Sequence, residues 1–318
     1  MSIDLRHLVT FRAVAGARSF TRAALALGYA QSSVTAHIQA LEAELGVALF
    51  DRTGKQIALT AAGQRLLVYA RQLLQLAEEA RVAIAEDDQP RGSVTISAPE
   101  TLCTYRLPVL LRAFRERCPQ ARVIFRPSGA ASLCRHVRDG EIDVAFVLEP
   151  PFQSADLEIE TLLREPVALI GRPDHQLAGS LAVAPADLAN EPILLTEAGC
   201  AYRMLFERAL AAAGAAPRDS VEFSSVEAIK QCVAAGMGLA VLPVVAVERE
   251  LAQGQLAVLR WAGPSLEVVT QMVWHARRWQ SPALRAFLQL ARELLAAELE
   301  IGSPSGAQRG RVRTNAET

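Results

Sequence analysis

The chain of 318 residues is long enough for two or three domains, each with a buried core of its own. With 51% hydrophobic and 21% charged residues, its composition is that of a globular protein and excludes a disordered or low-complexity chain. The formal net charge of −1 gives no overall preference for nucleic acid, so any basic surface must be local.

The first segment, Asp4 to Ala17, has apolar residues at helical spacing and is predicted to be an amphipathic helix. A charged helix at this position replaces the apolar core that a secretion signal requires, so we expect a cytoplasmic protein. Ser19 or Thr21 is predicted to cap a second helix, which ends at Gly28. These two helices would pack closely through small side chains.

The third predicted helix, Gln31 to Leu45, has two contrasting faces. One face is an apolar stripe, which would anchor the helix to its neighbours. The other face carries small or polar side chains with little charge, a pattern that suits close approach to base edges in a major groove. On a helical wheel the outward residues are Ser32, Thr35, Ala36 and Gln39.

Residues 47–59 are predicted to form two short strands around a glycine-containing turn, the pattern of a wing. Arg52 lies at the base of the wing and Lys55 at its tip, where they can neutralise phosphates or enter a minor groove. Residues 1–65 hold seven Arg or Lys against four Asp or Glu, so the basic excess is local. Three helices and a basic hairpin form a coherent DNA-binding module, although many three-helix domains bind proteins instead.

The segment from Ser19 to Gly63, SFTRAALALGYAQSSVTAHIQALEAELGVALFDRTGKQIALTAAG, resembles the DNA-binding region of LysR-type transcriptional regulators almost position by position. The resemblance implies a winged helix-turn-helix that binds double-stranded promoter or operator DNA. It implies that Gln31, Ser32 and Thr35 touch the DNA. It also places two arginines near the DNA backbone, Arg22 and Arg52.

Two positions depart from the family pattern. The family often has proline at the position of Ser32 and arginine at the position of Ala36. A base contact of the relatives is therefore absent here or passes to His37 or Gln39. The complete set of predicted DNA-binding residues is Arg22, Gln31, Ser32, Ser33, Thr35, Ala36, His37, Gln39, Arg52 and Lys55.

Thr60 is predicted to cap a long linker helix with a heptad seam. The alternative is a linker helix that packs only on its own domains. In the LysR family this helix dimerises, so the resemblance implies a homodimer that places two recognition helices on one two-fold-related DNA site. Further assembly of such dimers into a homotetramer is also expected, and the sequence leaves the choice between dimer and tetramer open. The predicted seam consists of Leu66, Ala70, Leu73, Ala77, Ala80 and Ile84.

A polar break at Asp87 to Gly92 marks a domain boundary, after which strands alternate with helices as in a parallel α/β sheet. The fold class is therefore multidomain α/β: an all-α winged helix-turn-helix, a linker helix and a two-lobed effector-binding domain. The two lobes resemble the type II periplasmic-binding-protein architecture that the family shares. We expect a DNA-binding domain at 1–60, a linker at 61–90, an effector domain at 91–301 with lobe I at about 91–163 and 268–301 and lobe II at about 164–267, and a disordered tail at 302–318.

Several helices expected in the effector domain are preceded by short segments with Ser or Thr that could bind a ligand. In open α/β sheets, ligands sit beyond the carboxyl ends of strands, where helix N-termini present free N–H groups. Ser and Thr at helix starts are also common as simple caps. The match to the cleft positions of the family favours a small-molecule site, with the predicted set Ser97, Glu100, Thr101, Ser128, Leu148, Thr196, Cys200, Arg203 and Ser225.

The charge of the ligand stays open at this stage. Arg106 and Arg203 could pair with an anionic ligand, but Glu100 and Glu197 could equally satisfy them. The five cysteines form no C-x-x-C pair and have no histidine at metal-ligand spacing, so we expect no metal and no other cofactor. Two cysteines at helix starts are candidates for redox sensing or for ordinary buried thiols, namely Cys103 and Cys200.

Other classes of protein find less support in the sequence. No nucleophile elbow, P-loop or dinucleotide fingerprint indicates an enzyme, and a transport solute-binding protein would need a secretion signal. The longest apolar stretch, Cys232 to Val247, is interrupted by glycine and proline and predicts helix, strand and helix in place of a membrane span. The expected partners are DNA, a small-molecule effector and a second copy of the chain, with RNA polymerase as a further candidate.

Overall fold

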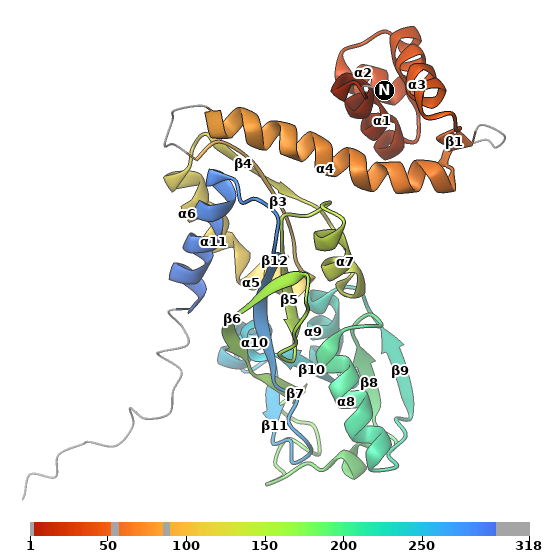
Figure 1. Ribbon diagram of the computed structural model, residues 1–318. Coiled ribbons are helices and arrows are strands. Elements are labelled where there is room, and N and C mark those ends of the chain that lie inside the picture. The colour runs from red at the N-terminus through yellow and green to blue at the C-terminus, as the bar shows by residue number, and fades with distance from the viewer. Residues whose placement is uncertain (1–2, 52–56, 85–89, 297–318) are drawn as a thin grey trace, which may run out of the picture. The chain divides into compact units, whose positions relative to one another are not determined.

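The computed structural model describes residues 3–51, 57–84 and 90–296 of the chain (Figure 1). These residues fall into two compact units, one formed by residues 1–89 with 138–141 and the other by the rest. Arg52 and Lys55, which were expected in the wing, lie outside the described residues, as does the expected tail.

The N-terminal unit has the predicted order of three helices, a hairpin and a long helix. Asp4 caps the first helix, and of the two candidates for the cap of the second helix, Ser19 and Thr21, it is Ser19 that caps it. Gly28, with φ of 68°, ends the second helix in the left-handed conformation that glycine adopts without strain. The elements are α1 (Leu5–Ala17), α2 (Phe20–Leu27), α3 (Gln31–Leu45), β1 (Phe50–Asp51), β2 (Ala58–Leu59) and α4 (Ala61–Ile84).

The core of this unit forms where the apolar faces of its helices meet. Phe11 of α1 is fully buried, and its ring lies 5.4 Å from that of Phe50 in the hairpin. The stripe of α3, including Val34 and Ile38, is buried against α1 and α2, as its period of 3.6 residues predicts. The outer face of α3 is therefore fixed in space by the packing of its inner face.

The long helix α4 packs against α1 and has an exposed apolar stripe that differs from the predicted seam. Ala70 of that seam is buried in the core of the unit, so it is not free to contact another chain. The exposed apolar side chains are instead Tyr69, Leu73 and Leu76, which are 63%, 41% and 60% exposed. The exposed stripe therefore contains Tyr69 where the predicted seam contains Ala70, because α1 covers the face of α4 that holds Ala70.

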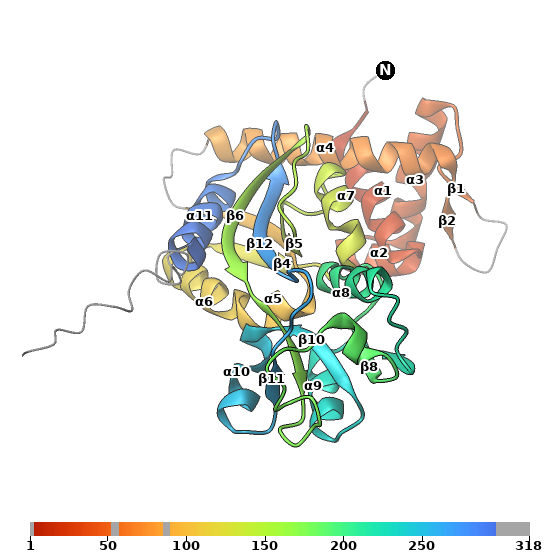
Figure 2. The same ribbon diagram turned by 90° about the horizontal axis from the view of Figure 1, so that it is seen from below.

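The second unit contains two five-stranded sheets (Figure 2). The first sheet has the order β4-β3-β5-β12-β6, with parallel pairing around β3 and antiparallel pairing around β12. The second sheet has the order β11-β7-β10-β8-β9. The strands are β3 (Gly92–Ser97), β4 (Ala121–Phe125), β5 (Val144–Glu149), β6 (Leu157–Glu165), β7 (Val167–Gly171), β8 (Pro192–Leu195), β9 (Asp219–Glu222), β10 (Leu239–Pro243), β11 (Ala257–Leu259) and β12 (Val268–His275).

The chain crosses between the two sheets twice, once from β6 to β7 and once from β11 to β12. The second sheet is therefore built from one continuous segment, β7 to β11, whereas the first sheet is completed by β12, which returns to it as expected. Helices cover the faces of both sheets: α5 (Glu100–Tyr105), α6 (Leu107–Arg117), α7 (Leu133–Arg138), α8 (Ala201–Ala212), α9 (Val226–Ala234), α10 (Val244–Ala252) and α11 (Pro282–Ala291).

The central strand β5 illustrates how the first sheet is packed. Its residues alternate in direction, so Phe146 joins the large core with α6 and α11, whereas Ala145 and Val147 join a smaller core with α7. Figures 1 and 2 show α6 and α11 on one side of this sheet and α7 on the other. Because both faces are covered, β5 is apolar along most of its length, which is typical of a buried strand.

The sequence pattern predicts helices over Thr104 to Arg117 and Pro282 to Leu299, and both differ from the observed helices. The helix expected at 104–117 is divided at Arg106, because Pro108 has no N–H to bond the carbonyl one turn earlier. The helix expected to run from Pro282 to Leu299 is regular to Ala291 and continues as a π-helical turn over Arg292–Ala296. Within the described ranges, no helix combines the length and apolar character needed to cross a membrane.

Candidate functional site

The outer face of α3 is the candidate DNA-binding face. Ser32, Ala36 and Gln39 lie at its centre and are exposed, and Gln31 and Ser33 flank them. None of the three central residues has a side-chain hydrogen bond to another described residue. Their atoms are therefore available to an external partner without loss of an internal contact.

The residues at the edges of this face also serve the N-terminal unit. Thr35 is half-buried, and its hydroxyl donates to the carbonyl of Gln31 at 3.0 Å. His37 faces α1, where its Nδ1 lies 3.0 Å from the hydroxyl of the buried Thr10. Arg22 donates to a backbone carbonyl at the end of α1. His37 and Gln39 were the two residues that could replace the base contact of the family. Because His37 contacts Thr10, it is less available to bases than Gln39.

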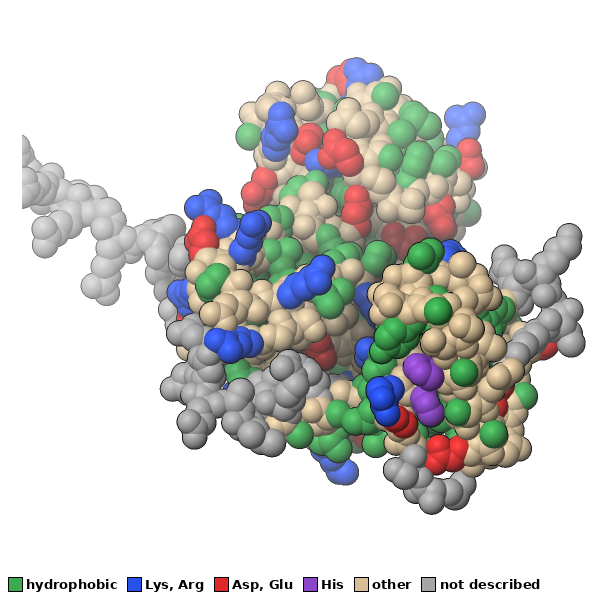
Figure 3. All heavy atoms as spheres, turned by 90° about the horizontal axis from the view of Figure 1, so that it is seen from above, with side chains coloured by type: hydrophobic (Ala, Val, Ile, Leu, Met, Phe, Trp, Pro, Cys, Tyr) green, Lys and Arg blue, Asp and Glu red, His purple; other side chains and the backbone are tan. Residues whose placement is uncertain are grey.

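On the face of the molecule seen in Figure 3, the charge is dispersed. Figure 3 shows Lys and Arg side chains spread singly over one face of the molecule, with no single large basic patch among the coloured atoms. This agrees with the small local excess of basic residues found in the sequence. Close contact by the neutral face of α3 would then contribute more to recognition than long-range attraction.

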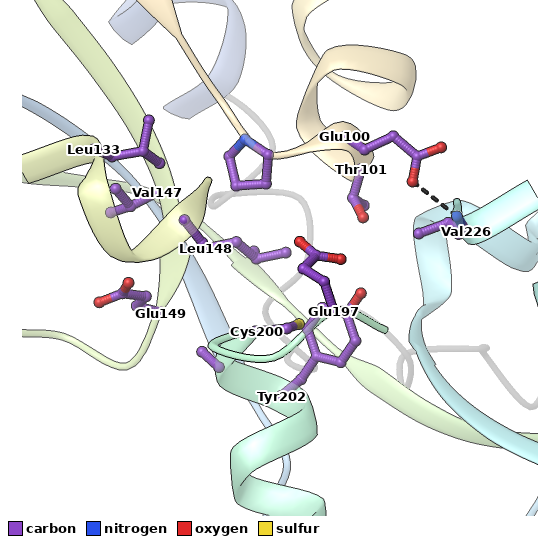
Figure 4. A pocket seen from close by; sticks show the side chains of 13 residues that line it. Glu100, Thr101, Leu133, Val147, Leu148, Glu149, Glu197, Cys200, Tyr202 and Val226 are labelled. Atoms are coloured by element: carbon purple, nitrogen blue, oxygen red, sulfur yellow. Dashed lines mark hydrogen bonds between the residues drawn. The ribbon is translucent and has the colours of Figure 1, made fainter. Parts of the chain in front are cut away.

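A pocket lies between the two lobes of the second unit, beyond the end of β5 and at the N-termini of α5, α8 and α9 (Figure 4). It encloses about 460 Å³ of empty space, part of which is open to solvent. Apolar side chains form most of its wall. Its lining consists of Pro99, Glu100, Thr101, Ala130, Leu133, Val147, Leu148, Glu149, Glu197, Cys200, Ala201, Tyr202 and Val226.

Four of the nine residues predicted for the effector site line this pocket, namely Glu100, Thr101, Leu148 and Cys200. The other five are close to it in sequence but are not part of its lining. Their side chains are either buried or bonded to neighbouring protein groups. These five residues are Ser97, Ser128, Thr196, Arg203 and Ser225.

The five residues outside the lining have identifiable structural surroundings. Ser97 and Thr196 are buried at strand ends, and neither hydroxyl has a hydrogen-bond partner of good geometry among the described residues. The hydroxyl of Ser128 lies 2.8 Å from Nδ1 of His136. Ser225 is the N-cap of α9, which is the ordinary capping role that the sequence also allowed.

Neither arginine considered for the ligand pairs as the sequence suggested. Arg106 makes a two-pronged ion pair with the buried Glu165, at 2.8 Å from Nε and 3.0 Å from Nη2. Arg203 pairs with Glu222 at 2.6 Å and with Glu207 at 2.9 Å. Both arginines are thus satisfied by carboxylates other than Glu100 and Glu197, and neither lines the pocket.

The predicted effector set lacked most of the apolar wall and two carboxylates, Glu149 and Glu197. Glu149 follows Leu148 at the last position of β5, so the rule that ligands sit beyond strand ends could have found it. Tyr202 lies in the first turn of α8 and is buried. Leu133 and Val226 carry no sequence signal for a pocket, because apolar residues at helix starts are common in any core.

The two lobes are joined beside the pocket by polar contacts between α5 and α9. A carboxylate oxygen of Glu100 accepts the N–H of Val226 at 2.8 Å, which satisfies a free donor at the start of α9 (Figure 4). Lys230 of α9 donates to the hydroxyl of Tyr105 at 3.1 Å and to the carboxylate of Glu250 at 3.0 Å. Because the contacts of Glu100 and Lys230 join α5 of one lobe to α9 of the other, a change in the separation of the lobes would alter them.

The thiols near the pocket are held in their neutral form. Burial raises the pKa of Cys103 to about 11, and the nearby Glu100 acts in the same direction. Burial also raises the pKa of Cys200, despite its position at the start of α8. A low thiol pKa is the property that makes a cysteine reactive, so these surroundings favour the structural reading of both residues over redox sensing.

A helix-turn-helix unit followed by a two-lobed α/β unit with a pocket between the lobes is the organisation of a ligand-responsive transcriptional regulator. Residues 5–64 match the family described as "Bacterial regulatory helix-turn-helix protein, lysR family". Residues 87–296, more than half of the chain, match the "LysR substrate binding domain". The chain therefore belongs to the LysR family of transcriptional regulators, and the fold class predicted from the sequence is confirmed.

Similar proteins share both units. Over 292 residues the chain is 39% identical to the uncharacterised HTH-type transcriptional regulator YwqM of Bacillus subtilis (strain 168), covering 92% of this chain and 99% of the relative. A full-length OxyR variant from Pseudomonas aeruginosa has a similar structure, with a TM-score of 0.74, 27% identity and coverage of 92% and 95% of the two chains. Full-length CbnR in complex with its target DNA gives a TM-score of 0.61 at 27% identity, covering 91% and 99%.

Proposed function

We propose that this LysR-type regulator is a cytoplasmic, non-enzymatic homo-oligomer that binds promoter or operator DNA and changes its DNA complex when a small molecule enters the inter-lobe pocket. The observation that carries the proposal is the outer face of α3, which is exposed, neutral and without internal hydrogen bonds at its centre. The similar chain CbnR has been solved with its target DNA, which supports the same use of the N-terminal unit here.

The proposed domain organisation follows from the sequence reading. Residues 1–60 bind DNA, 61–90 link and dimerise, and 91–301 bind the effector, with lobe I at about 91–163 and 268–301 and lobe II at about 164–267. The proposed DNA contacts are centred on Ser32 and Gln39, which are exposed and have no side-chain hydrogen bond to another described residue. In the wing, Arg52 and Lys55 are proposed to contact phosphates.

The proposed dimer forms through α4. The exposed apolar stripe of Tyr69, Leu73 and Leu76 recurs at spacings of four and three residues, which is the spacing of a helix–helix seam. A second copy of the same stripe would remove these side chains from water. Dimerisation would present two α3 helices to two half-sites of one DNA duplex.

The proposed effector site is the pocket, with Glu100, Thr101, Leu148 and Cys200 as contacts from the predicted set. A ligand shifts an equilibrium between conformations only by its difference in affinity for them. Because the pocket walls belong to both lobes, a bound ligand can favour one separation of the lobes over another. That preference is the source of free energy for a change in the DNA complex.

Footprinting tests the proposal. The full-length chain is bound to a promoter fragment, and protection is mapped with and without each compound of a metabolite set, alongside transcription from the same fragment. We expect at least one compound to change both the protected region and the transcript level. An unchanged footprint and unchanged transcription across the set would contradict ligand control, whereas absence of any protected region would contradict DNA binding itself.

A further inference from the structure

The charged side chains that line the inter-lobe pocket are all acidic. Its charged side chains, among the residues described as lining it, are three glutamates, Glu100, Glu149 and Glu197. The remaining lining residues are apolar or neutral. We propose that the effector is an organic cation, a small molecule that carries a protonated amine or guanidinium group on an apolar body. This inference rests on the proposed function of the pocket as the effector site.

The carboxylate of Glu100 already has partners. It accepts the backbone N–H of Val226 at 2.8 Å and the hydroxyl of Ser225 at 3.4 Å. It therefore occupies the N-terminus of α9, a position that would otherwise attract an anionic ligand. A carboxylate-bearing effector would have to displace Glu100 to reach these donors.

The carboxylates of Glu149 and Glu197 have no hydrogen bond or ion pair within the described part of the chain. Figure 4 shows the carboxylate of Glu197 among the labelled side chains of α5 and α8, with Glu149 to one side at the end of β5. Burial raises the pKa of Glu149, and no positive group acts on it to offset this. A cation beside either group would supply the missing counter-charge.

Basic side chains on or next to the helices that border the pocket are engaged elsewhere. Arg106 pairs with the buried Glu165, and Arg203 pairs with Glu222. Lys230 pairs with Glu250 at 3.0 Å and with Glu227, in the first turn of α9, at 2.7 Å. None of these three cations lines the pocket, so an anionic effector would meet carboxylates without a neighbouring positive side chain.

Helix N-termini oppose this charge only in part. The start of α8 faces the pocket, and a helix N-terminus carries about half a positive charge. Two unpaired carboxylates outweigh that contribution. The apolar wall, which includes Leu133, Val147 and Leu148, would receive the body of the effector, as in most small-molecule sites.

Three probes of the same shape and different charge test the inference: n-butylammonium, sodium butyrate and 1-butanol. Each is added to the full-length chain at matched ionic strength, and the melting temperature and the calorimetric Kd are measured. We expect n-butylammonium to raise the melting temperature more than 1-butanol, and butyrate to leave it unchanged. In Glu197→Gln the Kd for n-butylammonium should rise at least about tenfold, which corresponds to the loss of one charge-assisted contact.

The control variant is Glu158→Gln, which changes an exposed glutamate of β6 outside the pocket and should bind n-butylammonium like the parent. If Glu197→Gln does not fold, Glu149→Gln provides the second test. Binding of butyrate in preference to n-butylammonium would overturn the cation but leave the pocket as the effector site. Failure of all three probes to bind would count against both, and a gel shift on the same samples would report DNA binding separately.

Discussion

The outer face of α3 and the inter-lobe pocket differ in how much their side chains contribute to the fold. Ser32 and Gln39 are exposed and have no internal partners, so the fold of the N-terminal unit does not depend on them. In the pocket, Glu100 holds the start of α9 and Tyr202 is buried. Changes on the DNA-binding face should thus separate function from stability, whereas changes around the pocket should alter both.

The strongest test of this difference is the buried ion pair beside the pocket. Lys230 is 4% exposed, and its partner Glu250 is 7% exposed. Lys230→Met would leave the Glu250 carboxylate buried without its counter-charge, so we expect the free energy of unfolding to fall by about 3–5 kcal/mol. Urea denaturation followed by circular dichroism measures this loss.

The control for the ion pair is the double variant Lys230→Met with Glu250→Leu. An apolar pair of similar volume often replaces a buried ion pair with little change in stability, so most of the loss should be recovered. A single variant that costs less than about 1 kcal/mol would mean that the pair is effectively solvated.

The thiol next to the pocket gives the next largest effect. With a pKa of about 11, Cys103 should be alkylated by iodoacetamide far more slowly in the native chain than in the unfolded chain at the same pH. Each unit of pKa above the ordinary value lowers the thiolate fraction about tenfold, so the expected ratio is roughly 100. Peptide mass spectrometry after pulse labelling measures the rate at each cysteine. Equal native and unfolded rates would restore redox sensing as a candidate role.

A smaller free-energy change is expected on the DNA-binding face, and it should appear in binding alone. Gln39→Ala removes an exposed amide that can pair with a base edge, so specific affinity should fall by about 1–3 kcal/mol. Thr35→Ala should act in the same direction. Stability should change by no more than about 0.5 kcal/mol in either variant. Gel shifts and thermal melts measure the two quantities, with Glu116→Gln on the exposed surface of α6 as the control.

The smallest effect concerns Glu100. Glu100→Gln keeps a hydrogen-bond acceptor at the start of α9 but removes the negative charge, so the expected loss of stability is about 0.3–1 kcal/mol. Thermal melts at low ionic strength would detect it, and added salt should reduce the difference from the parent. A loss that does not respond to salt would point to altered packing in place of an altered charge.

The exposed outer face of α3 was predictable because the period of a helix fixes the direction in which each side chain points. Val34, Ile38 and Leu41 are buried as the pattern requires, and the opposite residues are therefore exposed. The seam of α4 was predicted less well, since the sequence does not say which face α1 covers. Ala70 is buried there, so the exposed stripe begins at Tyr69.

The pocket was predictable only in outline, because its lining depends on how separate elements meet. The rule of strand ends identified the region of the pocket and four of its lining residues. Arg203 was expected at the ligand, but it pairs with Glu222 on β9, a strand that the sequence analysis did not predict. The same rule could have found Glu149 at the end of β5, whereas Tyr202 could be recognised as a pocket residue only from the assembled lobes.

The central claim is that the outer face of α3 reads duplex DNA. Its most direct test is selection of the full-length chain on a random duplex library, followed by titration of the selected duplex at several salt concentrations. The account predicts an enriched sequence, an affinity that falls as salt rises, and loss of that preference in Gln39→Ala. No enrichment, together with no salt-dependent affinity for any duplex, would contradict it.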